Sequence, residues 1–170
     1  MQTLQDTHMI RKLVLLAILI FSTQAHAQNM EDFTVKNIYF HMGVIAAFAE
    51  VVNMDVKQIG LSEMFTEEEA SKWEPVVRHI AERNNVKYYR ENDFLVTDLF
   101  DPARTDGKTL FLIYKGDTLE KYQTLKKKKA ELIAQNKYDK AARRDIATAF
   151  GRLLDYSDEV IDRLIEGSDH

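Results

Sequence analysis

Two histidines and their acidic neighbours are the residues of this chain best suited to acid–base or metal chemistry. His41 and Glu50 are nine positions apart, and at about 100° per residue they point to opposite faces of a helix. One helix therefore cannot bring them together, although either could meet a group from a neighbouring helix. His79 and Glu82 are three positions apart and share a helix face. The pattern makes His41 and Glu50 candidate catalytic residues and makes His79 and Glu82 candidate metal ligands.

A divalent metal would need more ligands than the second pair supplies. If the helix with His79 packs against the helix with His41, then His41 or Glu50 could complete such a site. The site would partly resemble the carboxylate–histidine metal sites of helix bundles. Those sites repeat a Glu-x-x-His motif, whereas this chain has the reverse order in His79 and Glu82. The alternative is a hydrogen-bonded His41 in the core and a solvated pair on the surface.

A second group of polar residues surrounds the segments that are rich in β-branched and aromatic residues. Tyr88, Arg90, Asp98 and Arg104 make up this group. Alternation along a strand places Tyr88 and Arg90 on one sheet face, where an arginine fork could hold an acidic or sugar-like small molecule. The sequence predicts a ligand-binding site from these residues, and the alternative is an ordinary polar sheet face with cross-strand ion pairs.

The familiar catalytic spacings are absent from the sequence. It contains no Gly-x-Ser-x-Gly, no His-Glu-x-x-His, no glycine-rich phosphate loop and no dinucleotide fingerprint. The chain also has no cysteine, which excludes a disulfide, a thiol nucleophile and a thiolate-bound metal. If the protein is an enzyme, His41 is the expected acid–base residue, since imidazole is the side chain that exchanges protons near neutral pH.

The first 27 residues have the three parts of a secretory signal peptide. Arg11-Lys12 forms a basic start, residues 13–21 are uniformly apolar, and Ala25-His26-Ala27 matches an Ala-x-Ala cleavage site. Nine apolar residues are too few for a transmembrane anchor, which needs about 20. The sequence therefore predicts cleavage of residues 1–27, a mature chain that begins at Gln28, and a periplasmic or secreted protein.

The mature chain is predicted to be acidic. Without Asp6, Arg11 and Lys12, the 27 acidic and 23 basic residues become 26 and 21, a net charge of −5 with neutral histidines. Binding to a phosphate backbone requires a concentrated basic face, so this charge argues against nucleic acid as a partner. In the run Lys126–Lys129 the outer two lysines are expected to lie along the apolar stripe of a helix, with solvated lysines between them.

The segments that would position these residues are mostly helical. Residues 30–53 are apolar in nearly every direction around a helix, which predicts a buried central helix. Small residues at Gly43 and Ala47 leave a membrane helix pair as the less favoured alternative. Thr66 and Glu69 form a capping box, which predicts the start of a second helix.

Strands are predicted in the middle of the chain and a helical hairpin beyond them. Residues 86–90, 94–100 and 109–114 combine β-branched and aromatic residues with the period of a strand. The last of these runs is uniformly apolar, so it should lie in the centre of the sheet. After it, two apolar stripes separated by Asn136-Lys137 predict an αα-hairpin.

These elements predict an α+β fold class. One mostly helical domain over residues 28–170 should contain a small three-stranded antiparallel sheet between an N-terminal helix pair and a C-terminal αα-hairpin. The leading functional prediction is a small exported, soluble cell-envelope protein that acts as a binding or accessory module. Its expected partner is a small molecule or another envelope protein, and no membrane span remains after signal cleavage. The alternative is a small enzyme that uses His41 with Glu50, His79 or Glu82, either by acid–base chemistry or with the assistance of a divalent metal as cofactor.

Overall fold

The computed structural model describes residues 38–167. The chain divides into two units, residues 1–40 and residues 41–170. Of the first unit only residues 38–40 are described, and they belong to a helix that ends at residue 53. The predicted signal peptide lies outside the described residues. Between residues 38 and 167, no helix is both long enough and apolar enough to cross a membrane.

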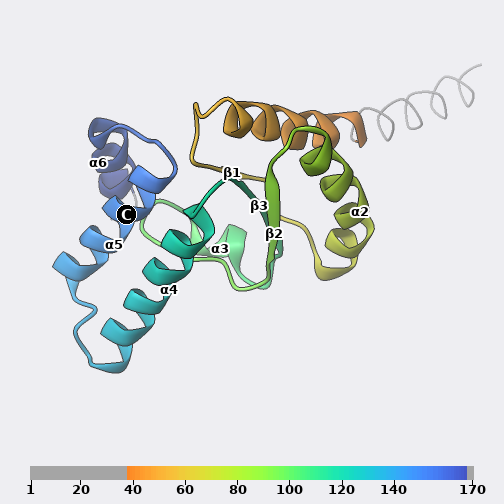
Figure 1. Cartoon of the computed structure of the whole chain (residues 1–170). Coiled ribbons are helices and arrows are strands. Elements are labelled where there is room, and N and C mark those ends of the chain that lie inside the picture. Colours follow the sequence, from red (N-terminus) through yellow and green to blue (C-terminus); the bar gives the residue numbers. More distant parts are fainter. Residues whose placement is uncertain (1–37, 168–170) are drawn as a thin grey trace, which may run out of the picture. The chain divides into compact units, whose positions relative to one another are not determined.

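The second unit combines helices with one small sheet (Figure 1). After the helix that ends at residue 53, the elements are β1 (Ile59–Leu61), α2 (Glu67–Arg83), β2 (Lys87–Glu91), α3 (Pro102–Thr105), β3 (Leu110–Tyr114), α4 (Thr118–Ala134), α5 (Lys140–Leu153) and α6 (Asp158–Gly167). The fold class is α+β and mostly helical, as the sequence predicts.

The sheet is antiparallel and has β3 in its centre. Its strand order is β1-β3-β2, and Ile59 of β1 and Lys87 of β2 lie opposite Tyr114 from the two sides. The predicted central position of the apolar strand is confirmed, because residues 110–113 are at most 1% exposed.

One of the three predicted strands is wrong. Residues 94–100 form an irregular loop between β2 and α3, and the third strand is instead the short β1. Side chains of α4 hold this loop: the Tyr122 hydroxyl accepts a hydrogen bond from the Leu95 N–H at 3.0 Å, and Lys129 Nζ donates to the Val96 carbonyl at 2.6 Å. These bonds satisfy backbone groups that a strand would pair with its neighbours.

The β1 strand is too short to leave a periodic signal in the sequence. Its middle residue is Gly60, where a Cβ atom would come within 2.7 Å of the Phe48 Cβ. Glycine at this position therefore allows the helix that ends at residue 53 to pack closely on the strand.

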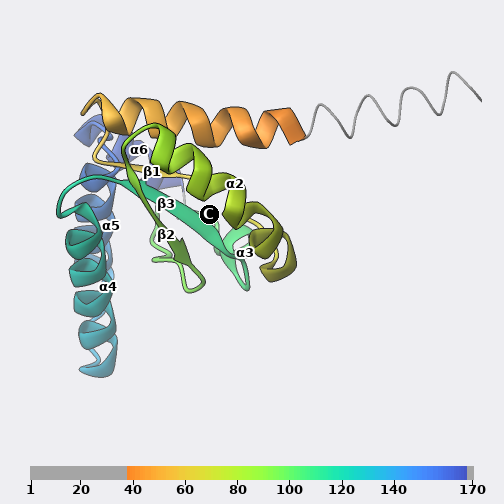
Figure 2. The same cartoon turned by 45° about the vertical axis from the view of Figure 1, so that its right-hand side comes forward.

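The two faces of the sheet build two separate cores, and Figure 2 shows the strands between the helices that cover them. On one face, the helix that ends at residue 53 and α2 pack on Phe111 and Ile113 of β3. On the other face, α4, α5 and α6 pack on Leu110 and Leu112. Alternate residues of one strand thus belong to different cores, as the two-residue period of a strand requires.

The prediction that the first helix is buried on all sides is also wrong. Ile45, Ala49 and Val52 are buried, but Met42 and Glu50 are exposed. The buried residues recur at intervals of four and three along one face. That face packs on α2 and the sheet, so the helix forms an outer layer.

The helix α2 begins where the sequence predicts. The Thr66 hydroxyl accepts a hydrogen bond from the Glu69 N–H at 3.2 Å, and the Glu69 carboxylate accepts one from the Thr66 N–H at 2.8 Å. This confirms the capping box. From there α2 continues as one helix through Pro75.

Candidate functional site

His41 lies beside an acidic partner that the sequence does not indicate. Its Nδ1 forms an ion pair with the Glu63 carboxylate, and its ring centre lies 5.7 Å from that of Phe65 and 5.4 Å from that of Trp73. The side chain of His41 is 25% exposed. His41 therefore lies at the edge of the core and is only partly buried, whereas a structural role inside the core would require full burial.

The structure does not bring Glu50 to His41. Glu50 is exposed on the same helix, and nine residues of helix separate the two by about 13 Å along the axis. The carboxylate that meets His41 comes instead from Glu63, in the segment between β1 and α2. The predicted catalytic pair is thus replaced by a different histidine–carboxylate pair.

The predicted metal ligands stay on the surface of α2. His79 and Glu82 are both exposed, and His41 is engaged with Glu63. Within residues 38–167, no three histidine, aspartate or glutamate side chains lie close enough together to hold a metal ion. The predicted grouping of His79 and Glu82 with His41 or Glu50 is therefore not assembled in the described part of the chain.

Tyr88 and Arg90 share one sheet face, as predicted, and join β2 to α2. Arg90 forms ion pairs with Glu67 at 2.5 Å and with Glu74 at 2.9 Å, and the Tyr88 hydroxyl donates to the Glu74 carboxylate at 3.3 Å. The Arg90 side chain is only 20% exposed. Its guanidinium fork thus holds a strand to a helix.

Asp98 and Arg104 do not join Tyr88 and Arg90. Tyr88 packs in the core on the α2 side of the sheet, whereas the loop that contains Asp98 packs on the side of α4, α5 and α6. Asp98 forms an ion pair with Arg143 of α5 at 2.6 Å, and Arg104 is exposed. Of the four predicted ligand-binding residues, Asp98 is the one that lines the hollow described next.

The loop of residues 94–102 borders two adjoining hollows, which together we call the loop groove. The two hollows share Asp98, Phe100 and Pro102. The first has a volume of about 430 Å³ and is also lined by Val96, Thr97, Lys129, Tyr138 and Arg143. The second has a volume of about 570 Å³ and is also lined by Leu99, Asp101, Arg163, Leu164 and Gly167.

The αα-hairpin positions the polar side chains of the first hollow. Lys129 extends from α4, Tyr138 lies in the connection between the helices, and Arg143 belongs to the first turns of α5. The start of α5 is fixed by its N-cap, since the Asp139 carboxylate accepts a hydrogen bond from the Ala142 N–H at 2.9 Å. Because α4 and α5 are neighbours, all three side chains reach the same loop.

Of the two cations in the first hollow of the loop groove, one has a carboxylate partner and the other has a neutral hydrogen-bond acceptor. Arg143 and Asp98 form an ion pair, whereas Lys129 Nζ donates to the neutral Val96 carbonyl and lies 5.5 Å from the centre of the Tyr138 ring. Burial lowers the pKa of the Lys129 ammonium, an effect that the Asp98 carboxylate partly opposes. Burial also raises the pKa of the Tyr138 hydroxyl.

The sequence does not single out Lys129, Tyr138 or Arg143 as site residues. The sequence does hold one indication for Lys129. Its helical position predicts that its side chain lies along an apolar stripe, and the structure confirms that Lys129 is half-buried. Its meeting with the loop depends on how the αα-hairpin packs, and no local spacing records that.

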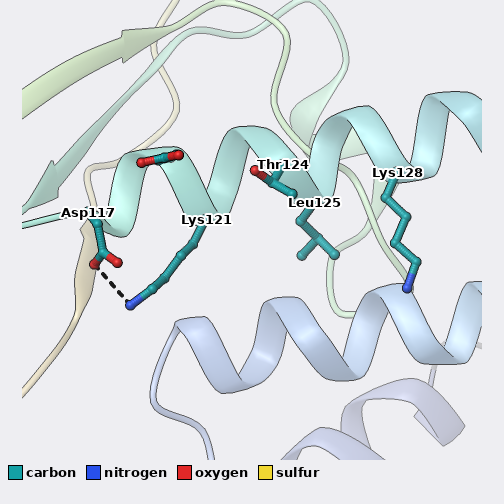
Figure 3. A pocket seen from close by; sticks show the side chains of 6 residues that line it. Asp117, Lys121, Thr124, Leu125 and Lys128 are labelled. Carbon is teal, nitrogen blue, oxygen red and sulfur yellow. Dashed lines mark ion pairs between the residues drawn. The ribbon is translucent and has the colours of Figure 1, made fainter.

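Another hollow, of about 390 Å³, lies on α4 itself. Its lining residues are Asp117, Glu120, Lys121, Thr124, Leu125 and Lys128, which follow one side of this helix from its N-cap (Figure 3). Lys121 is paired with Asp117 at 2.9 Å, one turn away. A single helix contacts a ligand from one side only, so the loop groove, lined by several elements, is the stronger candidate.

No protein-family model, curated protein or solved structure matches this chain. The function is therefore argued from the geometry of the described residues.

Proposed function

We propose that this chain is an exported binding protein that holds a small molecule in the loop groove. The observation that carries the proposal is the convergence of Lys129, Tyr138 and Arg143 on one hollow of about 430 Å³. Small-molecule sites typically have hollows of this size, in which apolar walls carry a few polar groups from different elements.

The residues around the groove favour binding over catalysis. The ionisable side chains of its first hollow are the cations Lys129 and Arg143, the aspartate Asp98, which is paired with Arg143, and the tyrosine Tyr138. The Tyr138 phenol is protonated at neutral pH, since its ordinary pKa of 10.0 is raised further by burial, and it can donate a hydrogen bond. The pair of His41 and Glu63 contacts the core on the opposite face of the sheet, so it does not act on a ligand in this groove.

Export is supported by the signal-peptide pattern of residues 11–27. A chain without cysteine also folds without disulfide chemistry in an oxidising compartment. A reporter fused behind residues 1–27 should reach the periplasm or the medium, with a mature N-terminus at Gln28. Retention of an uncleaved product in the membrane would contradict this part of the proposal.

A ligand screen by NMR tests the binding function. The ¹⁵N-labelled mature chain is titrated with a panel of small carboxylates, amines, amides and sugars. At least one compound should cause saturable shifts that cluster in residues 96–102 and 138–143. A panel in which no compound perturbs these residues would contradict the proposal.

Arg143 and Arg144 provide a matched pair of variants for that screen. Each forms an ion pair with an aspartate at 2.6 Å, Arg143 with Asp98 in the groove and Arg144 with Asp162 outside it. Arg143→Gln should weaken binding about tenfold, as expected for one charge-assisted hydrogen bond. Arg144→Gln should leave the affinity unchanged.

The ion pair of His41 with Glu63 favours acid–base catalysis as a second candidate function. A carboxylate that orients an imidazole is a common arrangement for a general base, and both side chains are partly exposed. A panel of chromogenic esters, glycosides and peptides tests this candidate. Turnover that is lost in His41→Gln and kept in the exposed-surface control His79→Gln would place catalysis ahead of binding.

A further inference from the structure

We propose that the ligand of the loop groove is an organic acid with one negative charge and an apolar body, whose carboxylate binds the Lys129 ammonium. This inference rests on the proposed binding function and adds the chemical class of the ligand. Three features carry it: the hydrogen-bond partner of Lys129, the charge balance of the groove and its apolar lining.

Lys129 is a partly buried cation whose hydrogen-bond acceptor is neutral. Its Nζ donates to the Val96 carbonyl at 2.6 Å, and an ammonium group has three hydrogens to donate. The Asp98 carboxylate acts on it only through longer-range electrostatics. By contrast, three residues earlier on the same helix, Lys126 meets the Glu91 carboxylate at 3.1 Å.

The desolvation of Lys129 is not offset by a close anion. Burial disfavours its charged form more than nearby acids favour it, and the Asp98 carboxylate is already paired with Arg143. A ligand carboxylate placed against Nζ would supply the opposite charge that the groove lacks. Charge-assisted hydrogen bonds of this kind are about twice as strong as neutral ones.

The charge balance of the groove suits a single negative charge. In the first hollow, the cations Lys129 and Arg143 face one acid, Asp98, which leaves one positive charge in surplus. The adjoining hollow adds one further acid, Asp101, and one further cation, Arg163, so the surplus is unchanged. A monocarboxylate would neutralise the surplus, whereas a phosphate dianion would exceed it and be repelled by Asp98.

The walls beside Lys129 suit an apolar body. Val96, Phe100 and Tyr138 are half-buried and pack against the core on the side of α4, α5 and α6, and Pro102 adds a further apolar surface. An aromatic ring can stack on the Tyr138 ring while its carboxylate reaches Nζ. Phenylacetate, a ring that bears a carboxylate on a short arm, has both features.

Phenylacetate and phenylacetamide form a matched pair of probes that differ in charge at the polar end. Both are titrated into the ¹⁵N-labelled mature chain, and the shifts of residues 96–102 and 138–143 give the affinities. Phenylacetate should bind there about tenfold more tightly than phenylacetamide, the effect of one charge-assisted hydrogen bond. Bound phenylacetate should also raise the pKa of Lys129 towards its ordinary value, which an NMR titration of the Lys129 Cε signal measures.

Lys129→Gln and Lys127→Gln are the matched variants of the protein. Lys127 is on the same helix, is 79% exposed and does not line the groove. Lys129→Gln should reduce the affinity for phenylacetate about tenfold and leave that for phenylacetamide unchanged, while Lys127→Gln should change neither. If Lys129→Gln fails to fold, Lys129→Arg keeps the positive charge and should retain the preference for phenylacetate.

The outcomes separate this inference from the proposed function. Equal affinity of the two probes at the groove, or no loss in Lys129→Gln, would overturn the carboxylate assignment while the binding function stands. Failure of both probes, together with binding of another compound class at the groove, would also overturn the inference alone. If no compound perturbs the groove, the binding function itself is contradicted.

Discussion

Lys126 and Lys129 share one side of α4 but should affect stability differently. Lys126→Met removes the cation that pairs with Glu91, whose side chain is 4% exposed. This should lower the free energy of unfolding by about 3 kcal/mol, the low end for breaking a buried ion pair. Lys129→Met removes a partly buried cation with a lowered pKa, together with its hydrogen bond to the neutral Val96 carbonyl, so the loss should be smaller, about 1 kcal/mol. Urea unfolding at neutral pH measures both variants, and equal losses would contradict the contrast.

His41 is expected to act as a structural residue at the edge of the core. His41→Ala removes ring contacts with Phe65 and Trp73 and takes the ion-pair partner from Glu63. It should lower the free energy of unfolding by about 1–2 kcal/mol. His41→Gln keeps a donor for the Glu63 carboxylate and should recover part of this loss. Unfolding curves of both variants test the prediction, and an alanine variant as stable as the unchanged chain would contradict it.

At the scale of residues, the sequence predicts positions within an element better than partners across elements. The shared face of Tyr88 and Arg90 and the half-burial of Lys129 are confirmed because both follow from the period of one strand or helix. The partnership of His41 with Glu63 joins a helix to a distant loop. It depends on how one element packs on another, and no spacing in the sequence encodes that.

At the scale of elements, the start of α2 makes a pH-dependent contribution to stability. The backbone N–H of Thr66, and then its hydroxyl, hold the pKa of the Glu69 carboxyl below its ordinary value of 4.5. An acid with a lowered pKa stabilises the fold above that ordinary value, and the contribution is lost as the pH falls through the lower folded value. Glu69→Gln should therefore lower the free energy of unfolding at neutral pH by about 0.5 kcal/mol, a figure kept small because the group is solvent-screened.

The pH dependence provides the check on this prediction. The difference between Glu69→Gln and the unchanged chain should narrow as the pH falls below about 4 and vanish once Glu69 is protonated in both states. Urea unfolding at a series of pH values measures it. A difference that persists undiminished to about pH 3 would show that the loss has a cause other than the charge of Glu69.

The elements that the sequence predicts are those with a long periodic pattern or a local start signal. The α2 capping box, the αα-hairpin and the central strand β3 all meet this condition. Residues 94–100 have the composition of a strand, but side chains of α4 satisfy their backbone groups. Residues 59–61 have no such pattern and become a strand because β3 offers an open edge. Strand identity here depends on the available partner, which composition alone does not specify.

At the scale of the whole unit of residues 41–167, β3 links the two cores. Leu110 and Leu112 pack on one side of the sheet, and Phe111 and Ile113 on the other. A second link joins the start of β1 to the end of α5, because the Gln58 N–H donates to the Asp155 carboxylate at 2.6 Å. A substitution that destabilises one core should therefore also destabilise the other, and the unit should unfold in one cooperative transition.

Phe150→Ala tests this coupling from the far side of the sheet. Phe150 is fully buried among α4, α5 and α6, so its truncation should lower the free energy of unfolding by about 3–5 kcal/mol. Trp73 is the sole tryptophan of the chain and stacks on Phe65 in the opposite core, so its fluorescence reports on the side that the substitution does not touch. If β3 couples the cores, the urea midpoint from Trp73 fluorescence should fall as far as the midpoint from far-ultraviolet circular dichroism. Phe111→Ala removes a buried ring from the core against which Trp73 packs. In this variant too, the urea midpoints from fluorescence and from circular dichroism should fall by the same amount. A fluorescence midpoint that stays in place while the dichroism midpoint falls would mean that the two cores unfold independently and that one shared strand is not enough to join them.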